Sequence, residues 1–369
     1  MKQTQATHSF PATGQPTRLR LLLLPLAIFL LLTALWAGLI RLGWRWPPLQ
    51  PTLPMAHGPL MVCGFLGTLI SLERALGLGR RWAYSAPVLT GVGALLLVAG
   101  VQSALGPLLI TLGSLVLVSV LVQIVRIQPA LFTITIALGG LLWAVGNGLW
   151  LAGRPVPDVV LWWMGFLVLT IVGERLELSR ILRLSTLTYS LFFLSISLFI
   201  VGLCSTLFAF DLGVRLIGGG LIAQSLWLLH YDIARRRLKS GGQARFIAIS
   251  LLIGYGWLGV GGGLALLNGG WRAGPLYDAF LHAVFLGFVF SMIFAHALII
   301  FPAVLGIPLV YSSRFYSHLA LLHLSLLLRI SSDWLPWGPG RLWGGLLNGI
   351  ALLLFLINTV AALDRTRRL

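Results

Sequence analysis

Residues 53–76 read LPMAHGPLMVCGFLGTLISLERAL, an apolar run of membrane-spanning length with a histidine, His57, about one turn inside its start. An imidazole surrounded by hydrocarbon needs a partner, because leaving a polar group unpaired there is costly. Gly58, the next residue, has no side chain and lets a flat, bulky group approach the backbone closely. His57 is therefore either a ligand of a bound group or a histidine hydrogen-bonded to a carbonyl of a neighbouring helix.

Similar apolar runs recur along the whole chain. Of its 369 residues, 58% are hydrophobic and only 9% are charged, a composition that excludes an ordinary soluble fold. The runs do not alternate polar and apolar residues as the strands of a membrane barrel do. The first run is also too long for a signal peptide and is followed by no small-residue cleavage site. We therefore expect an all-α, polytopic integral membrane protein.

Glycine, proline and charged residues divide the apolar sequence into about twelve predicted spans. The break near residues 103–107 is the least marked, and a single helix there would invert the topology of everything downstream. Residues 1–17 are polar and are predicted to form a flexible cytoplasmic tail, followed by a single transmembrane domain over residues 18–369. The predicted spans are 19–42, 53–77, 84–103, 106–126, 129–151, 158–177, 185–209, 211–231, 245–267, 275–300, 314–331 and 341–363.

The positions of the cations test this topology. If the N-terminus is inside, seven of the 26 Lys and Arg residues fall on the outer side and the remaining 19 on the cytoplasmic side, as the positive-inside rule requires. This bias predicts a multi-pass protein of the bacterial inner membrane with both termini cytoplasmic. The basic loop at residues 235–239 favours anionic lipid, not nucleic acid, as its neighbour. The seven outer cations are Arg41, Arg45, Arg154, Arg215, Arg272, Arg329 and Arg341.

A second histidine lies at the same predicted depth as His57. The spans at 53–77 and 275–300 both run from outside to inside, so His57 and His282 each lie one to two turns below the outer surface. Two histidines on different helices at one level can bind opposite faces of one haem iron. Such a six-coordinate haem has no open position, so it transfers electrons or senses and binds no substrate.

The carboxylates of a haem would need cations on the same side of the membrane. Arg41, Arg45 and Arg341 are placed just outside the first and last spans, with tryptophans around them. They are candidate partners of those carboxylates. The alternative is an aromatic belt with ordinary flanking arginines.

A second set of polar residues lies deeper in the predicted membrane. His296 is fourteen residues beyond His282, which is nearly four turns and about 21 Å, so the two cannot bind the same iron. Glu174, His318 and His323 are predicted at a similar depth to His296. The four residues form either a second metal or relay site or, as we favour, a hydrogen-bond network between helices.

These features resemble subunit I of the haem-copper oxidases. The resemblance rests on His57, Gly58 and Met61 as a His-Gly-x-x-Met sequence, on the histidine early in the tenth span, and on twelve spans. It implies a bundle like that of subunit I and a low-spin haem b held by the two histidines. The oxidase copper site, however, needs histidines on the sixth and seventh spans, and no histidine occurs between His57 and His230. We therefore expect no oxygen-reducing copper centre, and the sequence assigns no reaction.

The sequence is more similar to the NnrS family, haem-associated membrane proteins of the nitric oxide response. The similarity covers the tenth span, from residue 278 through Gly287 and Met292, and the Gly-Ile-Pro-Leu turn at 306–309. It implies His57 and His282 as the ligands, with nitric oxide or a redox partner as the functional contact. This sequence departs from the family pattern at Val304, where the family has a histidine. A copper ion has no support in the residues.

Two other functions stay open at this stage. The first is a haem-free secondary transporter that uses the buried histidines and Glu174 as a proton or substrate path. Against it stands the absence of a recognisable internal repeat. The second is an accessory subunit of a respiratory complex, which no residue pattern in the sequence indicates or excludes.

Overall fold

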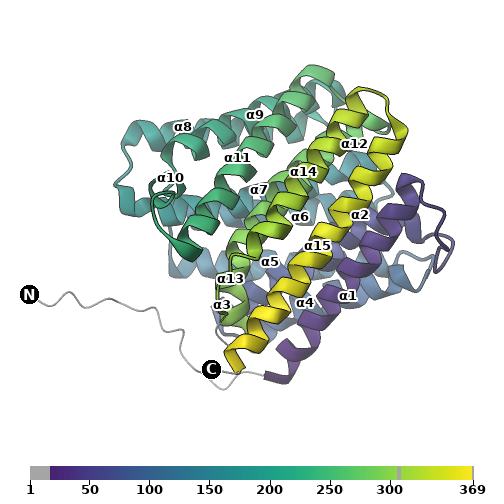
Figure 1. The fold of residues 1–369 in the computed structure, drawn as a ribbon, viewed down its shortest axis with the longest axis horizontal. Helices are drawn as coiled ribbons and strands as arrows, with labels where there is room; N and C mark the ends of the chain where they lie inside the picture. The colour runs from purple at the N-terminus through teal and green to yellow at the C-terminus, as the bar shows by residue number, and fades with distance from the viewer. Residues whose placement is uncertain (1–16, 306–308, 368–369) are drawn as a thin grey trace, which may run out of the picture.

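The computed structural model describes residues 17–305 and 309–367, and its elements there are helices packed into one bundle (Figure 1). Eleven helical runs in this part of the chain are long and apolar enough to cross a membrane. The expectation of an all-α, multi-pass membrane protein is therefore confirmed. The predicted tail lies outside the described residues except for Thr17, as does the turn at 306–308 within the stretch that resembles NnrS.

The helices follow the predicted spans closely, and most boundaries agree within a few residues. Short 3₁₀ segments precede two of the spans and follow a third. The principal helices are α1 (Thr17–Leu42), α2 (His57–Pro59), α3 (Thr68–Leu78), α4 (Ser85–Val98), α5 (Leu105–Ile127), α6 (Leu131–Leu151), α7 (Val156–Ser179), α8 (Thr186–Ser205), α9 (Phe210–Tyr231), α10 (Ala234–Arg237), α11 (Gly242–Asn268), α12 (Pro275–His282), α13 (Ser291–Leu305), α14 (Phe315–Trp334) and α15 (Gly338–Arg367).

The least marked break in the sequence is a true break. Helix α4 ends at Val98 and α5 begins at Leu105, so two spans are present here and not one long helix. Gly100 lies between them with φ +73°, a left-handed conformation that glycine adopts without strain. The predicted span of 84–103 therefore runs too far by about one turn, because the last apolar residues belong to the turn.

Helix α14 corresponds to the predicted span 314–331 and is more polar than the eleven apolar runs. It is a helix of 20 residues that lies along α15. Its polar side chains turn inward: His318, His323 and Arg329 are each at most 8% exposed. The low hydropathy of α14 thus comes from buried polar contacts and not from a solvent-exposed face.

Two of the spans contain a π-helical segment that begins within three residues of a histidine. In the second span, Leu53–Leu78, His57 is followed by the π-helical residues Leu60–Gly67. In the tenth span, Pro275–Pro302, His282 is followed by the π-helical residues Ala283–Phe290. A π-helical turn inside an α-helix is uncommon and is frequent at functional sites.

Helices that follow each other in sequence pack side by side around a buried centre. The second span, α7 and the tenth span are the most buried of the apolar runs. Around them α8, α9 and α11 lie at one side, and α1 and α15 lie side by side at the other (Figure 1). Helix α1 begins and α15 ends at the same end of the bundle, as expected if α14 is a twelfth span beside the eleven apolar runs.

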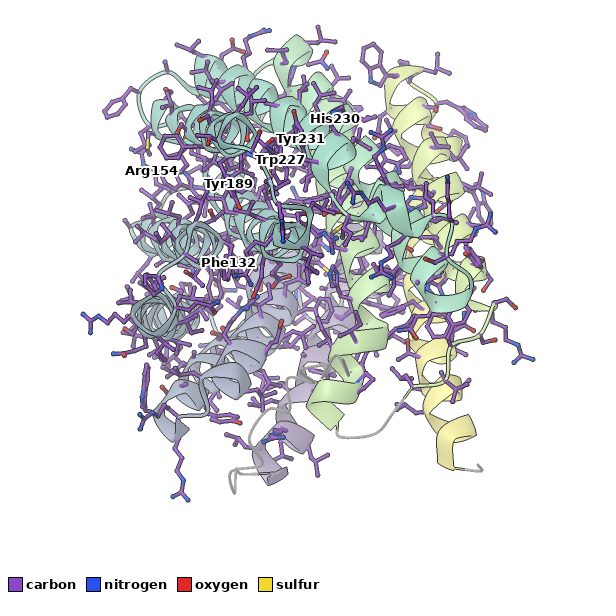
Figure 2. All side chains as sticks on the ribbon, turned by 90° about the vertical axis from the view of Figure 1, so that its left-hand side faces the viewer. Phe132, Arg154, Tyr189, Trp227, His230 and Tyr231 are labelled. Atoms are coloured by element: carbon purple, nitrogen blue, oxygen red, sulfur yellow. The ribbon has the colours of Figure 1, made fainter. Side chains whose placement is uncertain are left out.

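A buried ion pair joins α7 to the end of α9. The Arg175 guanidinium donates two hydrogen bonds of 2.9 Å to the carboxylate of Asp232, whose side chain is fully buried. Removing one member of such a pair leaves an uncompensated buried charge. Nearby on α9, Trp227, His230 and Tyr231 form a cluster of rings in which His230 is exposed (Figure 2).

Candidate functional site

The rings of His57 and His282 face each other across the junction of the second and tenth spans. Their centroids are 6.4 Å apart and their planes differ by 17°. This separation is too large for direct ring stacking. A metal ion bound to two imidazole nitrogens on opposite sides lies about 2.0–2.1 Å from each, which places the ring centroids roughly 6 Å apart. The structure thus brings the two predicted ligands to the spacing that one metal ion between them needs.

His57 is oriented by helix α1. Its Nδ1 lies 2.8 Å from the carbonyl oxygen of Ala34, which can only accept a hydrogen bond, so Nδ1 carries the proton and donates it. One turn along α1, a Cβ placed on Gly38 would lie 2.6 Å from both Nδ1 and Cε1 of the imidazole. Gly38 is therefore the residue that makes room for the His57 ring.

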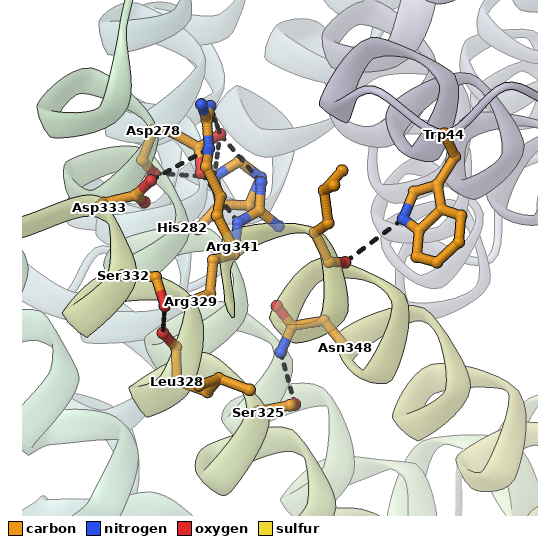
Figure 3. A network of polar contacts seen from close by, with 11 residues as sticks. Trp44, Asp278, His282, Ser325, Leu328, Arg329, Ser332, Asp333, Arg341 and Asn348 are labelled. Atoms are coloured by element: carbon orange, nitrogen blue, oxygen red, sulfur yellow. Dashed lines mark hydrogen bonds and ion pairs between the residues drawn. The ribbon is translucent and has the colours of Figure 1, made fainter. Parts of the chain in front are cut away.

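His282 is oriented by its own helix. Its Nδ1 lies 2.8 Å from the carbonyl oxygen of Asp278, one turn earlier, and 3.3 Å from the Asp278 carboxylate. That carboxylate accepts two hydrogen bonds from the Arg329 guanidinium, at 2.8 and 2.9 Å. Figure 3 shows how these contacts tie α12 to α14 beside the imidazole.

Both histidines are therefore in the same tautomer. A neutral imidazole whose Nδ1 donates a proton keeps a lone pair on Nε2. Within the described residues, neither His57 nor His282 has a hydrogen bond at Nε2. A backbone carbonyl on Nδ1 is the usual second contact of a metal-binding histidine, because it fixes the ring and directs Nε2 toward the metal.

The predicted arginines lie at different distances from this pair. Arg341 forms an ion pair with Asp333 at 3.0 Å and lies 3.9 Å from the Asp278 carboxylate (Figure 3). Arg41 lies close enough for its charge to act on His57. No contact in the described part of the chain links Arg45 to the pair.

Gly58 and the aromatic residues near the pair have other neighbours. A Cβ on Gly58 would meet Val156 of α7 at an ordinary contact distance of 3.6 Å, so the close approach beside His57 is made by Gly38 instead. Trp44 donates a hydrogen bond of 3.3 Å to the carbonyl of Leu342 and contacts the rings of Trp46 and Trp343. The predicted tryptophans thus form an aromatic cluster beside the arginines, as expected at a membrane interface.

The deeper polar residues do not form one cluster. His296 and Glu174 line one cavity, together with Glu73, which the sequence reading did not single out. Glu174 forms an ion pair with Arg74 of the second span. The two carboxylates and the imidazole therefore come from three different spans and face a common space.

His318 and His323 have separate partners. Asn358 lies 3.1 Å from Nδ1 of His318, whose ring is enclosed by phenylalanines, among them Phe294 at 4.6 Å. Trp257 donates a hydrogen bond of 3.0 Å to Nδ1 of His323. No three His, Cys, Asp or Glu side chains within residues 17–305 and 309–367 lie together so that they could hold a metal ion.

Three residues of the histidine site were absent from the predicted set. Asp278 and Arg329 are recognisable in the sequence only as single charges inside apolar runs, which is a weak signal of a buried pair. Gly38 carries no signal, because its role depends on how closely α1 approaches the second span. The signal that the sequence does carry is a pair of opposite charges at matching depth on two spans.

Together these features define an all-helical, multi-pass membrane protein with two facing, carbonyl-oriented histidines inside the bundle. The chain belongs to the family described as "Domain of unknown function (DUF8744)", whose model matches residues 20–364. No curated protein and no solved structure matches the chain.

Proposed function

We propose that this chain is a membrane haem protein in which Nε2 of His57 and Nε2 of His282 bind the two faces of one low-spin haem b. The observation that carries the proposal is the pair of near-parallel imidazoles, 6.4 Å apart, each with Nδ1 donating to a backbone carbonyl. A histidine that served only to satisfy itself inside the membrane would need no second histidine beside it in the same tautomer, with Nε2 of both rings unpaired.

The role of such a site is electron transfer or response to a redox ligand. A haem held by both histidines would supply one-electron redox chemistry, and substrate binding would be left to other parts of the protein. Within the chain, Ala34 and Asp278 orient the rings, and the Arg329 charge next to Asp278 offsets the carboxylate beside His282. These residues set the geometry and the local charge that a bound iron would experience.

The resemblance to the NnrS family makes nitric oxide the favoured physiological context. From the resemblance of the sequence to subunit I of the oxidases, the proposal includes an oxidase-like arrangement of spans around the histidines, with Arg41, Arg45 and Arg341 as the residues that would pair with the carboxylates of the haem. The charge distribution supports an inner membrane location with both termini cytoplasmic. An oxidase-type copper centre is not part of the proposal, because the required histidines are missing from the sequence.

A haem-free transporter is the second candidate function, and one observation favours it. The cavity that contains Glu73, Glu174 and His296 places ionisable groups within the spans, as transport paths do. A transporter of this kind would depend on the cavity. It would not depend on His57 and His282 keeping Nδ1 protonated and Nε2 unpaired. The two functions therefore predict different effects of changing the histidine pair.

The deciding experiment is an absorption spectrum of the purified protein before and after reduction with dithionite. We expect a b-type spectrum that is lost in His57→Ala and in His282→Ala, while both variants still insert in the membrane. His230→Ala is the matched control, because His230 is exposed at the end of α9 and should leave the spectrum unchanged. A colourless wild-type protein, or full haem content in either ligand variant, would contradict the proposal.

A further inference from the structure

A cavity lies within the bundle, deeper than the histidine pair. Its volume is ≈ 100 Å³, and its wall is formed by α1, the second span, α7, the tenth span and α15. Most of the wall is aliphatic, and Phe65, Phe301 and Phe355 add aromatic rings to it. An apolar cavity of about 150 Å³ holds a benzene ring. At ≈ 100 Å³ this cavity is smaller, so its largest occupant is a single flat ring, seated with some movement of the aliphatic wall.

Two polar groups on this wall have no hydrogen-bond partner. The Nδ1 atom of His296 lies 2.7 Å from the carbonyl of Met292 and donates to it, which leaves a lone pair on Nε2. In the part of the chain that the structure describes, the Glu73 carboxylate takes part in no hydrogen bond and no ion pair. Glu174, by contrast, is paired with Arg74. Two free proton acceptors, one imidazole and one carboxylate, thus face the same apolar space.

The chemistry of the wall limits the occupant. Among the described residues, no three potential ligands lie close enough together to form a metal site from protein groups alone. A ligand must instead reach from one acceptor to the other, offer a proton to each, and otherwise be apolar. A flat aromatic ring with two hydroxyl groups meets all three conditions, and the aromatic wall favours a flat ring.

We infer that this cavity binds the ring of a membrane quinol, with Glu73 and Nε2 of His296 as the acceptors of its two hydroxyl protons. This inference rests on the proposed function, because it names the electron donor of the haem held by His57 and His282. The quinol loses two protons, one to each acceptor, and two electrons, one at a time, and becomes the quinone. A haem held by His57 and His282 would take one electron in each step, and a downstream one-electron acceptor would reoxidise it between the two.

The fold connects the two places directly. His296 and His282 are on the same span, fourteen residues or about 21 Å apart along the axis, and the radius of a porphyrin would shorten that path. At the cavity end of this path, Phe65 of the cavity wall contacts Phe290 of the tenth span, with ring centroids 6.2 Å apart. Most of the π-helical residues between the two places, on the second and tenth spans, are buried, so this region is filled with packed side chains.

The test uses a short-chain ubiquinone analogue and measures two properties of the purified protein in detergent. The first is equilibrium binding of the oxidised analogue, followed by quenching of tryptophan fluorescence, which does not depend on haem. The second is the anaerobic rate at which the reduced analogue reduces the haem, followed by its absorption. For Glu73→Gln and His296→Leu we expect at least tenfold weaker binding and at least tenfold slower reduction.

The controls separate this inference from the proposed function. Dithionite should still give the full reduced spectrum in both variants, because the ligands of the iron are unchanged. Glu177→Gln is the matched carboxylate control, since Glu177 lies on α7 near Glu174 but pairs with Arg180 at the exposed surface, and it should behave as wild type. Ala297→Phe, which places a ring in the cavity, should abolish binding even if polar substitutions are tolerated.

The other possible results distinguish failure of the quinol site from failure of the haem proposal. A normal haem spectrum without binding of the analogue, or binding that none of the three cavity variants weakens, would overturn the quinol site and leave the haem proposal standing. Binding that depends on Glu73 and His296 in a protein that contains no haem would overturn the proposed function and keep the cavity as a quinone site.

Discussion

At the scale of single residues, the orientation and the tautomer of each histidine ring are set by the carbonyl group to which its Nδ1 donates. Nδ1 of His57 uses a carbonyl of α1, whereas Nδ1 of His282 uses a carbonyl of its own helix, yet both rings finish with Nε2 unpaired and nearly parallel planes. The sequence placed these residues at one depth, and the structure brings them together. The sequence alone could not reveal the tautomer of either histidine, because the tautomer depends on backbone carbonyl groups, which every residue has.

Gly38 provides the sharpest test at this scale. In Gly38→Ala the new Cβ would lie 2.6 Å from two atoms of the His57 imidazole, so the ring must turn away from the Ala34 carbonyl. We expect haem affinity to fall by about 10- to 100-fold, the range seen when an orienting contact of a metal-binding histidine is lost. The measurement is haem content and retention by the purified variant during dilution.

Gly77→Ala is the control for this substitution. Gly77 lies on helix α3, and a Cβ there would have no atom within 4 Å, so haem affinity should not change. Equal haem retention in the two variants would mean that Gly38 does not hold the histidine in place.

At the scale of the elements, the recurring feature is a histidine followed by a π-helical segment. A π-helical turn amounts to one extra residue inserted in an α-helix. Because the extra residue is accommodated locally, the helix before and after it presents the same face to its neighbours. The hydrophobic pattern of the sequence gives no sign of such a segment, since eight consecutive apolar residues fit an α-helix equally well. The two segments let each histidine face its partner while the rest of each span stays packed.

This reading predicts an unusual tolerance to deletion. Removing Phe285, a partly buried residue of the π-helical segment in the tenth span, should convert the segment to α-helix and leave the flanking halves in register. Removing Ile253 from the middle of α11 should instead rotate half of that helix by about 100° against its neighbours. We expect the first deletion variant to be recovered from the membrane as monodisperse protein, and the second to aggregate. Size-exclusion chromatography checks both, and aggregation of the Phe285 deletion alone would contradict the local role of the segment.

At the scale of the whole molecule, the order of the spans could be read from the sequence, but the burial of its charges could not. The cation count used Arg175 and Arg329 as surface charges, whereas both are buried and paired, with Asp232 and Asp278 respectively. These aspartates lie 57 and 51 positions away in the sequence, so only the folded chain brings each pair together. Removing both arginines from the count leaves the predicted orientation unchanged, because one comes from each side.

The orientation itself can be measured with reporter insertions. Because the 235–239 loop is basic and an odd number of spans separates it from the loop after α11, the two loops should lie on opposite sides of the membrane. We expect a fluorescent protein inserted after Ser240 to be bright and alkaline phosphatase at the same position to be inactive. After Arg272 the two reporters should give the reverse result. The same reporter active at both positions would exclude the twelve-span topology.

The 17° angle between the imidazole planes also has a magnetic consequence. Two nearly parallel rings donate π-electron density into the same iron d orbital, which lifts the near-degeneracy of the orbital pair that holds the unpaired electron of ferric low-spin iron. Electron paramagnetic resonance of the oxidised protein at low temperature should therefore give a rhombic signal with three resolved g values. A strongly axial signal would show that the rings stand crosswise once iron is bound, against the orientation that Ala34 and Asp278 impose.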